Sequence, residues 1–404
     1  MISGIIKLAR HGKSMARHVK SIWKQSRIEN KINKINKIKE YKALDQSSYS
    51  IFRKDILGFL SAMRVDDENV FFRYSASCRH PTLYASAYAC MTMSMLGELS
   101  RLELEEKKKW ADYFDGFQNP RDGLFYDSAV TNQIYNDSDW WGARHLALHM
   151  ISAYTDLGFK PKYQFHFLKK YYDIGCIEAW LNAFDWNDWS MLEGDIDNKI
   201  MNIGCLLQYQ RDTWNDVEAG KSLIFLKQYL LSKINANTGM WGVDELNTAW
   251  RRSRTVQFAY HLFPLFLYDG EIPEQCDKIV AIVLKTQNKF GGFGVAPNSS
   301  ACEDIDSIDL LIRLKPYVNQ QLGGEIDASI ERAFRWVLMN KMNDGGFVFK
   351  LHESFVYGHR ETSSLADQGA MLSTWFRTLS VVYMMKHLNI NGDYLITKCP
   401  GYEF

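Results

Sequence analysis

The chain has 404 residues with 48 basic and 47 acidic side chains, and 46% of its residues are hydrophobic. This composition gives ample apolar material for a packed core, so it predicts a globular protein. Its apolar stretches fall well short of the roughly 18 residues that a membrane-spanning helix needs, which excludes an ordinary transmembrane protein.

The seven cysteines are scattered and are never spaced as a CxxC pair. Their pattern argues against a disulfide framework and against a structural zinc site. Residues 1–25 alternate apolar residues with Lys or Arg and lack the apolar run of a secretion signal. We therefore expect a cytoplasmic protein.

Residues 1–45 carry twelve Lys or Arg and three acidic residues, a net charge of about +9. Apolar side chains recur there at helical spacing, and Ile32, Ile35 and Ile38 lie three apart. The pattern predicts a basic amphipathic helical extension, which could pack on the domain as a solvated helix, lie on the inner face of a membrane, or contact nucleic acid. Because no nucleic-acid recognition motif accompanies the charge, we expect no nucleic-acid partner.

Beyond residue 50, the sequence predicts helices separated by glycine-containing turns, with no run that alternates like a strand. Four turns resemble one another: each has an amide-bearing residue, then a glycine, then an aromatic residue. They are FQNPRDGLF at 117–125, INANTGMWG at 234–242, TQNKFGGFG at 286–294 and NKMNDGGFVF at 340–349. Glycine permits a positive φ at a helix end while the aromatic residue packs back, so we expect these turns to be scaffold.

The turn glycines recur at a regular interval. With Gly239, Gly292 and Gly346 as equivalents, the separations are 53 and 54 residues, and Gly123 precedes Gly239 by 116 residues, or two units of 58. One unit is degenerate and falls on the Trp- and Asp-rich stretch 186–197. Such a period is typical of repeats in which each helix pair buries its face on the next.

Six units of about 60 residues account for the rest of the chain. We therefore expect an all-α fold with two parts. Residues 1–45 form the basic amphipathic extension, and residues 46–404 form a single (α/α)6-type toroid, a barrel of inner and outer helices.

The turns at 286–294 and 340–349 resemble the Gln/Gly/aromatic repeats of squalene and oxidosqualene cyclases, class II diterpene cyclases and protein prenyltransferase β subunits. The resemblance is clear over 280–380, weaker over 110–260 and absent before residue 50. It implies an α/α toroid with inner and outer helix rings. In the cyclases built from two toroids the active site lies between the domains, whereas this sequence predicts one toroid.

The segment ACEDIDSIDLLIRL at 301–314 resembles the place where class II cyclases carry a DxDD motif. Serine at position 307 replaces the final aspartate of that motif. The resemblance implies that Asp306 is the proton donor and that Glu303 and Asp304 supply neighbouring carboxylates.

The prenyltransferases of this superfamily bind zinc through Asp, Cys and His. This chain has Asp306 where Cys is expected, and Asp367 and Gln368 near the expected His. We therefore expect neither zinc nor another metal nor a cofactor.

In a toroid, the segments after the glycine turns feed the inner helices, whose N-termini gather at one mouth, so their polar residues should line one cavity. The expected catalytic residues are Asp304, Asp306 and Asp309. The expected substrate-binding residues are Arg251, Arg252, Arg254, Asp139, Trp140, Trp141, His145, Asp367 and Trp375, with Arg377 nearby.

Each candidate also has an ordinary structural interpretation. Asp304 and Asp306 could be N-cap or first-turn residues that the helix dipole stabilises. The run WRRSR at 250–254 could be a solvated face or pair with carboxylates, and DWWGARHL at 139–146 could be core Trp with a satisfied His.

Class II cyclisation needs a carboxylic acid that protonates an alkene and aromatic walls that stabilise the resulting cation. The sequence offers both, so the first interpretation is a terpenoid-cyclase-like enzyme acting on an isoprenoid. The motifs DWWGARH, FDWNDW and RDTWND are more polar and also suit sugars, which leaves an enzyme of polysaccharide or glycolipid biosynthesis as the alternative. A non-catalytic binding scaffold is the third interpretation. The expected partner is a small-molecule or lipid-linked substrate.

Overall fold

The computed structural model describes residues 46–65, 70–132, 135, 139–188 and 195–402, together with 26, 29, 30 and 33. Residues 45–404 form one compact unit and residues 1–44 form another. The basic extension expected at 1–45 therefore lies almost wholly outside the described residues. Within the described part, no helix is both long enough and apolar enough to span a membrane.

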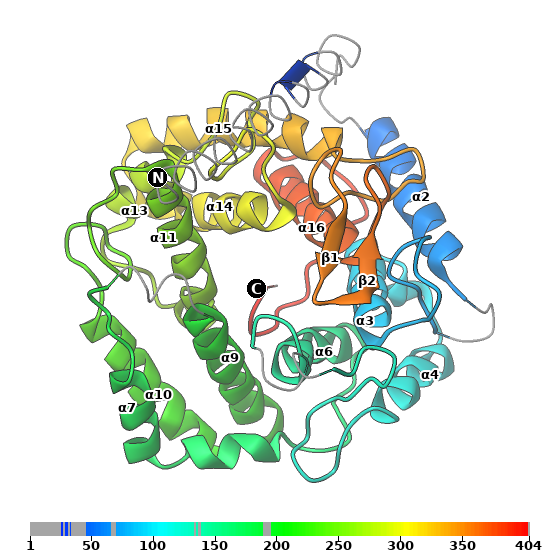
Figure 1. The fold of residues 1–404 in the computed structure, drawn as a ribbon, viewed down its shortest axis with the longest axis horizontal. Helices are drawn as coiled ribbons and strands as arrows, with labels where there is room; N and C mark the ends of the chain where they lie inside the picture. Colours follow the sequence, from blue (N-terminus) through cyan, green and yellow to red (C-terminus); the bar gives the residue numbers. More distant parts are fainter. Residues whose placement is uncertain are drawn as a thin grey trace, which may run out of the picture. The chain divides into compact units, whose positions relative to one another are not determined.

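Six helices form a closed inner ring in which each packs against the next and the last packs against the first (Figure 1). They are α3 (Leu83–Met95), α6 (Ala143–Leu157), α9 (Ile196–Trp214), α11 (Ala249–Leu262), α14 (Ala301–Leu314) and α16 (Met371–His387). In α16 every residue from Met371 to Met385 is buried. A helix that is buried all round belongs to the core, so α16 lies inside the toroid.

Six further helices surround this ring (Figure 1). They are α2 (Gln46–Met63), α4 (Leu104–Asp115), α7 (Ile174–Asn182), α10 (Val217–Ser232), α13 (Cys276–Leu284) and α15 (Gln320–Met339). Short helices join them: η1 (Leu99–Arg101), η2 (His166–Tyr171), α12 (Pro264–Leu267) and η3 (Lys315–Tyr317). Outer and inner helices alternate along the chain, so the predicted all-α toroid is confirmed.

The repeated turns hold each outer helix against the next. A Cβ atom on the turn glycine would lie 2.1 to 2.3 Å from a backbone carbonyl oxygen in three of them: Gly123 at Gln164, Gly291 at Arg332 and Gly345 at Asp55. Only glycine permits so close an approach at a positive φ. Because Asp55 lies on α2, the last turn closes the outer ring onto its first helix.

The positive φ falls on Gly291 and Gly345, so the sequence-based choice of Gly292 and Gly346 as equivalents is shifted by one residue. The amide residue of the motif has a role of its own. The Nε2 of Gln287 donates to the carbonyls of Gly291 and of Ser329 on α15, each at 2.9 Å. These hydrogen bonds join the turn to the next outer helix, which confirms the expected scaffold function.

A hairpin that the sequence did not predict lies between α15 and α16. Its strands β1 (Phe355–Tyr357) and β2 (His359–Ser364) pair antiparallel, with an irregularity before the turn. Gly358 lies against the ring of Trp141 at a positive φ of 75°, where a Cβ atom would lie 2.1 Å from that ring. The hairpin thereby brings Tyr357 against the inner helices.

The segment after α16 crosses the inner ring on the side where the inner helices end, and Figure 1 shows the last described part of this segment inside the ring. The N–H of Leu395 donates to the carbonyl of Met95, the last residue of α3, at 2.9 Å. Cys399 contacts Thr155 in the last turn of α6. One mouth of the toroid is therefore covered by the protein's own chain.

Candidate functional site

The acidic helix α14 begins with a capping box. The Oγ of Ser300 accepts the N–H of Glu303 at 3.1 Å, and the Oε2 of Glu303 accepts the N–H of Ser300 at 2.9 Å. This arrangement satisfies the exposed N–H groups of the first turn. Neither Asp304 nor Asp306 is the N-cap, but Asp304 lies in the first turn, as its structural interpretation proposed.

Asp304 is fully buried and accepts hydrogen bonds from several groups. Its Oδ2 accepts from Arg377 at 2.8 Å and from the indole of Trp336 at 2.9 Å. Its Oδ1 accepts from the hydroxyl of Ser299 at 2.7 Å and from the N–H of Phe293 at 2.9 Å. Burial raises the pKa of Asp304, and Arg377 and the other donors oppose that rise. This carboxylate joins the glycine turn, α14, α15 and α16.

Asp306 has the opposite environment. It is 3% exposed, and among the residues that the structure describes neither of its carboxyl oxygens has a hydrogen-bond or ion-pair partner. Burial raises the pKa of Asp306 well above its usual range, the charge of Glu303 raises it further, and Arg254 opposes the rise. Burial of a carboxyl without a partner favours its protonated form over the carboxylate.

A polar group on α9 and α11 lies near Asp306. Asp197 is fully buried, and its Oδ2 lies 3.2 Å from an Nη of Arg254 and 2.9 Å from the Nδ1 of His261. The charge of Asp197 also raises the pKa of Asp306. Arg254 is therefore held by the carboxylate of Asp197, and its charge acts on the acid on α14.

Aromatic rings surround the same region of the ring interior. Trp375 of α16 stacks on Tyr88 of α3, with ring centroids 5.2 Å apart and planes 19° apart. The ring of Tyr402 lies against His149 of α6 at 5.3 Å and meets Trp375 edge to face at 5.2 Å. Tyr260 of α11 lies near Asp306, whose charge contributes to the raised pKa of its buried hydroxyl. Ring faces of this kind attract a passing cation.

A hydrogen-bonded network lies at the start of α6. The Nδ1 of His145 is 3.0 Å from the hydroxyl of Tyr84, and its Nε2 is 3.2 Å from the hydroxyl of Tyr357. Burial lowers the pKa of His145 to about 3, and His261 lowers it further. His145 is therefore a neutral, hydrogen-bonded histidine, as its structural interpretation proposed, although it faces the same interior.

The other predicted substrate-binding residues just before α6 are partly buried in the core and partly at the surface. Asp139 pairs with Arg144 at 2.7 Å, and Trp141 is buried and stacks on Tyr84 at 5.9 Å. Trp140 is 36% exposed and lies 6.1 Å from Tyr357. Only Trp140 of this group presents its ring at the surface.

The remaining expected residues lie apart from Asp306. Arg251 pairs with Glu245 at 2.8 Å, and Arg252 donates to the carbonyl of Leu246 at 2.8 Å. Asp367 pairs with His352 at 2.6 Å on a half-exposed loop. Of the WRRSR run, only Arg254 reaches the buried acids.

Asp309 lies one helical turn beyond Asp306 and accepts from the Nε of Arg313 at 2.6 Å. It lines a cavity of about 340 Å³ together with Arg313, Tyr383 and Ile396. Because Ile396 belongs to the segment that crosses the ring, this cavity opens on the covered side of the toroid.

Sequence reasoning missed four residues of this region: Asp197, His261, Tyr357 and Tyr402. Asp197 and His261 are 64 residues apart, and no local motif connects them. The only available signal was the repeat itself, because it places Asp197 in the first turn of an inner helix, as it does Asp304. Tyr357 and Tyr402 lie outside the helical repeat and had no such signal.

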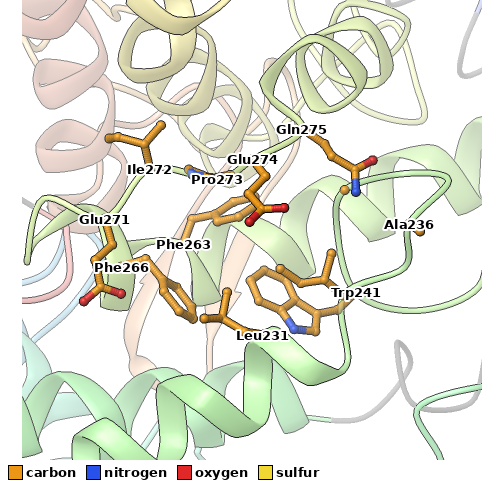
Figure 2. Close-up of a pocket in the computed structure, with 12 residues that line it drawn as sticks. Leu231, Ala236, Trp241, Phe263, Phe266, Glu271, Ile272, Pro273, Glu274 and Gln275 are labelled. Carbon is orange, nitrogen blue, oxygen red and sulfur yellow. The ribbon is translucent and has the colours of Figure 1, made fainter.

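A separate pocket of about 420 Å³ lies at the end of α10 and the beginning of α13, and Figure 2 shows its lining. Trp241, Phe263 and Phe266 form an apolar wall there, and Glu271 and Glu274 also line the pocket. None of the expected site residues lines it.

Within the described residues, no three His, Cys, Asp or Glu side chains gather as a metal-ion site.

Comparison with protein families finds no match, and comparison with curated proteins finds none. Among solved structures, the chain resembles a variant of the type II terpene cyclase MstE from Scytonema in complex with its product, merosterolic acid A. The identity is 12%, the match covers 84% of this chain and 96% of that chain, and the TM-score is 0.50.

Two further matches have lower TM-scores. A polysaccharide lyase is 11% identical, with 85% of this chain and 98% of that chain covered and a TM-score of 0.47. The ent-copalyl diphosphate synthase from Streptomyces platensis is 14% identical, with 76% and 50% covered and a TM-score of 0.41. Likeness at this identity concerns the fold alone. The chain is thus a single α/α toroid that is distantly terpenoid-cyclase-like in fold.

Proposed function

We propose that this protein is an enzyme that protonates a carbon–carbon double bond of an isoprenoid and so starts its cyclisation, with Asp306 as the acid. The observation that carries the proposal is the contrast between two aspartates on one helix. Asp304 accepts four hydrogen bonds and has a charged partner, whereas Asp306 is buried and has no such partner among the described residues. A carboxyl of the second kind is protonated and can donate.

The surroundings of Asp306 suit the cation that protonation would form. Tyr260, Tyr402 and Trp375 place ring faces or edges in the same interior. An enclosed aromatic cavity stabilises a carbocation through the ring quadrupoles and keeps water away from it.

The size of the toroid is compatible with this reaction. The match to the type II terpene cyclase from Scytonema covers 96% of that chain, so a cyclase can be built on one toroid of this length. The objection that two-toroid cyclases place their site between domains therefore does not exclude a single-toroid enzyme. The similarity supports the fold, and the residues of this chain support the chemistry.

The test is turnover in heavy water. The protein is incubated with geranylgeranyl diphosphate and with geranylgeraniol in D₂O, and the products are analysed by mass spectrometry. Transfer of the acidic proton to carbon predicts one deuterium bound to carbon in a cyclic product. Cyclic products without deuterium, or no conversion of either compound, would rule out protonation-initiated cyclisation of these substrates.

Arg254 should tune the acid. Its positive charge lowers the pKa of Asp306, so Arg254→Gln should raise that pKa further and weaken the acid. Because the protonated form is active, the alkaline limb of the pH–rate profile should move to higher pH while the plateau falls. Arg254→Lys keeps the charge and should stay close to wild type. An unshifted limb in Arg254→Gln would mean that Arg254 does not act on the catalytic acid.

A second candidate rests on the polar group formed by Asp197, Arg254 and His261. The carboxylate of Asp197 holds both Arg254 and His261, and such a wall could bind the hydroxyl or carboxylate groups of a sugar. This observation favours a glycan-modifying enzyme over a purely hydrocarbon site. Incubation with acidic oligosaccharides would distinguish the two, because a glycan enzyme would shorten or modify them and leave the prenyl compounds unchanged.

A further inference from the structure

The pocket of about 420 Å³ at the end of α10 and the beginning of α13 has an apolar surface that solvent reaches. Leu231 of α10 is 52% exposed there, and Ile234, Ile272 and Pro273 are partly exposed. A concave apolar surface of this volume is typical of a site for a small organic molecule. Its apolar side chains would cover the body of such a ligand.

The charged side chains of the pocket are both acidic. Glu271 and Glu274 are exposed, and no lysine, arginine or histidine occurs among the described residues that line the pocket. Figure 2 shows the carboxylate of Glu274 directed into the pocket. Within the described part of the chain this carboxylate has no hydrogen-bond or ion-pair partner. A positively charged ligand would supply the missing partner.

The nearest lysines are engaged elsewhere. Lys227 pairs with Glu271, and its Nζ also lies 2.7 Å from Asp269. Lys278 donates to the carbonyl of Ala236 at 2.7 Å. Neither lysine forms an ion pair with Glu274, so this acid keeps its charge available to the pocket.

A further acceptor lies next to Glu274 in the sequence. The side-chain Oε1 of Gln275, which also lines the pocket, is buried and accepts no hydrogen bond from a described residue. A buried acceptor without a donor is costly, and a ligand that donates N–H groups would remove that cost. The polar groups available here therefore call for a donor with positive charge.

We propose that this pocket binds an organic ammonium ion, with its charged head at Glu274 and Gln275 and its apolar body on Leu231 and the neighbouring apolar side chains. An ammonium group carries only donors and a positive charge, which matches the acceptors of the pocket. Burial of the ligand body and of the exposed Leu231 removes apolar surface from water. This site is independent of the reaction proposed for Asp306.

The first measurement compares three compounds that share one apolar body and differ in the head group. Binding of 4-phenylbutylamine, 4-phenylbutanol and 4-phenylbutyrate to the full-length protein is measured by calorimetry in low-salt buffer at neutral pH. The amine should bind most tightly and the carboxylate least tightly, with a difference of about 10-fold or more between them. An amine that binds no more tightly than the alcohol, or no detectable binding of the amine, would overturn the proposal.

The second measurement removes the charge of the pocket. Glu274→Gln keeps the shape of the side chain, so it should lower the affinity for the amine to about that for the alcohol and leave the alcohol unaffected. Glu105→Gln is the matched control, because Glu105 is an exposed acid on α4 that does not line the pocket. An unchanged affinity for the amine in Glu274→Gln would contradict the assignment of the head group.

The third measurement removes the apolar wall. Leu231→Ala should weaken binding of all three compounds, by about 5-fold for the amine. Ile224→Ala is the control on the same helix, because Ile224 is 58% exposed and does not line the pocket. Since both side chains are exposed, neither substitution should change the melting temperature much. Equal affinities in the two variants would place the ligand outside this pocket.

An ammonium ion could instead bind in the interior where the proposed reaction forms its cation, and Asp306→Asn distinguishes the two locations. If the pocket binds the amine, Asp306→Asn should retain the wild-type affinity for it. Loss of amine binding in Asp306→Asn, with normal binding in Glu274→Gln, would place the amine near Asp306 and overturn the pocket as its site. Failure of the proposed reaction would leave all these binding results unchanged.

Discussion

Asp306→Asn is expected to lower turnover by about 10²- to 10⁴-fold, the loss usual when a general acid is removed. Asparagine keeps the shape of the protonated carboxyl but cannot deliver a proton to carbon. Because Asp306 has no hydrogen-bond or ion-pair partner among the described residues, the substitution breaks no bond of the fold. The loss should therefore appear in kcat with little change in substrate binding.

The stability of the same variant gives an independent check. Burial raises the pKa of Asp306 above its unfolded value, so the carboxyl contributes stability below the unfolded pKa, and that contribution is lost as the pH rises through the folded pKa. Asparagine carries no such dependence. The melting temperature of Asp306→Asn relative to wild type should therefore increase as the pH is raised.

Thermal unfolding across a pH series, measured together with product formation, tests both expectations. A variant with normal turnover would remove Asp306 from the reaction. A variant that melts earlier than wild type at every pH would show that the carboxyl has a stabilising partner, in contrast to the environment described for it.

The repeat could be predicted from the sequence because its chemistry is local. Each turn needs a glycine that permits close approach and an amide that reaches the next outer helix, and both requirements leave a regular trace. The sequence shows that each turn contains a glycine, but it does not show which glycine of a GG pair adopts the positive φ. In the two GG pairs the positive φ belongs to Gly291 and Gly345. These two glycines lie against the backbone carbonyls of Arg332 and Asp55, and only this tertiary contact decides which glycine of the pair it is.

The cap of α14 could also have been found. Ser300 and Glu303 have the spacing of a capping box, which would have removed the N-cap interpretation from Asp304 and Asp306. The different roles of the two aspartates could not be predicted in the same way. They depend on Arg377, which is 73 residues from Asp304 and reaches it only when α14 and α16 pack together.

The position of Tyr402 inside the ring had no sequence signal. The segment that contains Tyr402 lacks helical periodicity, and its position depends on contacts with four inner or connecting helices. The pairing of Asp197 with His261 likewise requires α9 and α11 to be neighbours in the ring. Sequence patterns place residues on faces of helices, whereas ring closure decides which faces meet.

Asp304→Asn is the same chemical change two residues away, and it is expected to destabilise the fold by about 3 to 5 kcal/mol, the usual cost of breaking a buried ion pair. The guanidinium of Arg377 is fully buried, and the loss of Asp304 leaves its charge without a carboxylate. The amide of asparagine would also direct N–H groups at the hydroxyl of Ser299 or the indole of Trp336. Chemical denaturation of the two asparagine variants beside wild type measures the effect.

The double variant Asp304→Asn/Arg377→Met provides the control for Asp304. The double variant removes the buried charge of Arg377 together with the carboxylate of Asp304, so it should recover part of the stability that Asp304→Asn loses. The double-mutant cycle of these substitutions gives the coupling free energy between the two residues. The carbonyls of Val348 and Phe349, which Arg377 also contacts, remain unpaired and limit the recovery. Equal destabilisation by Asp304→Asn and Asp306→Asn would contradict the assignment of a structural carboxylate at one position and a free acid at the other. If Asp304→Asn mainly lowers stability and Asp306→Asn mainly lowers turnover, the two aspartates have different roles: Asp304 stabilises the toroid, and Asp306 donates the proton.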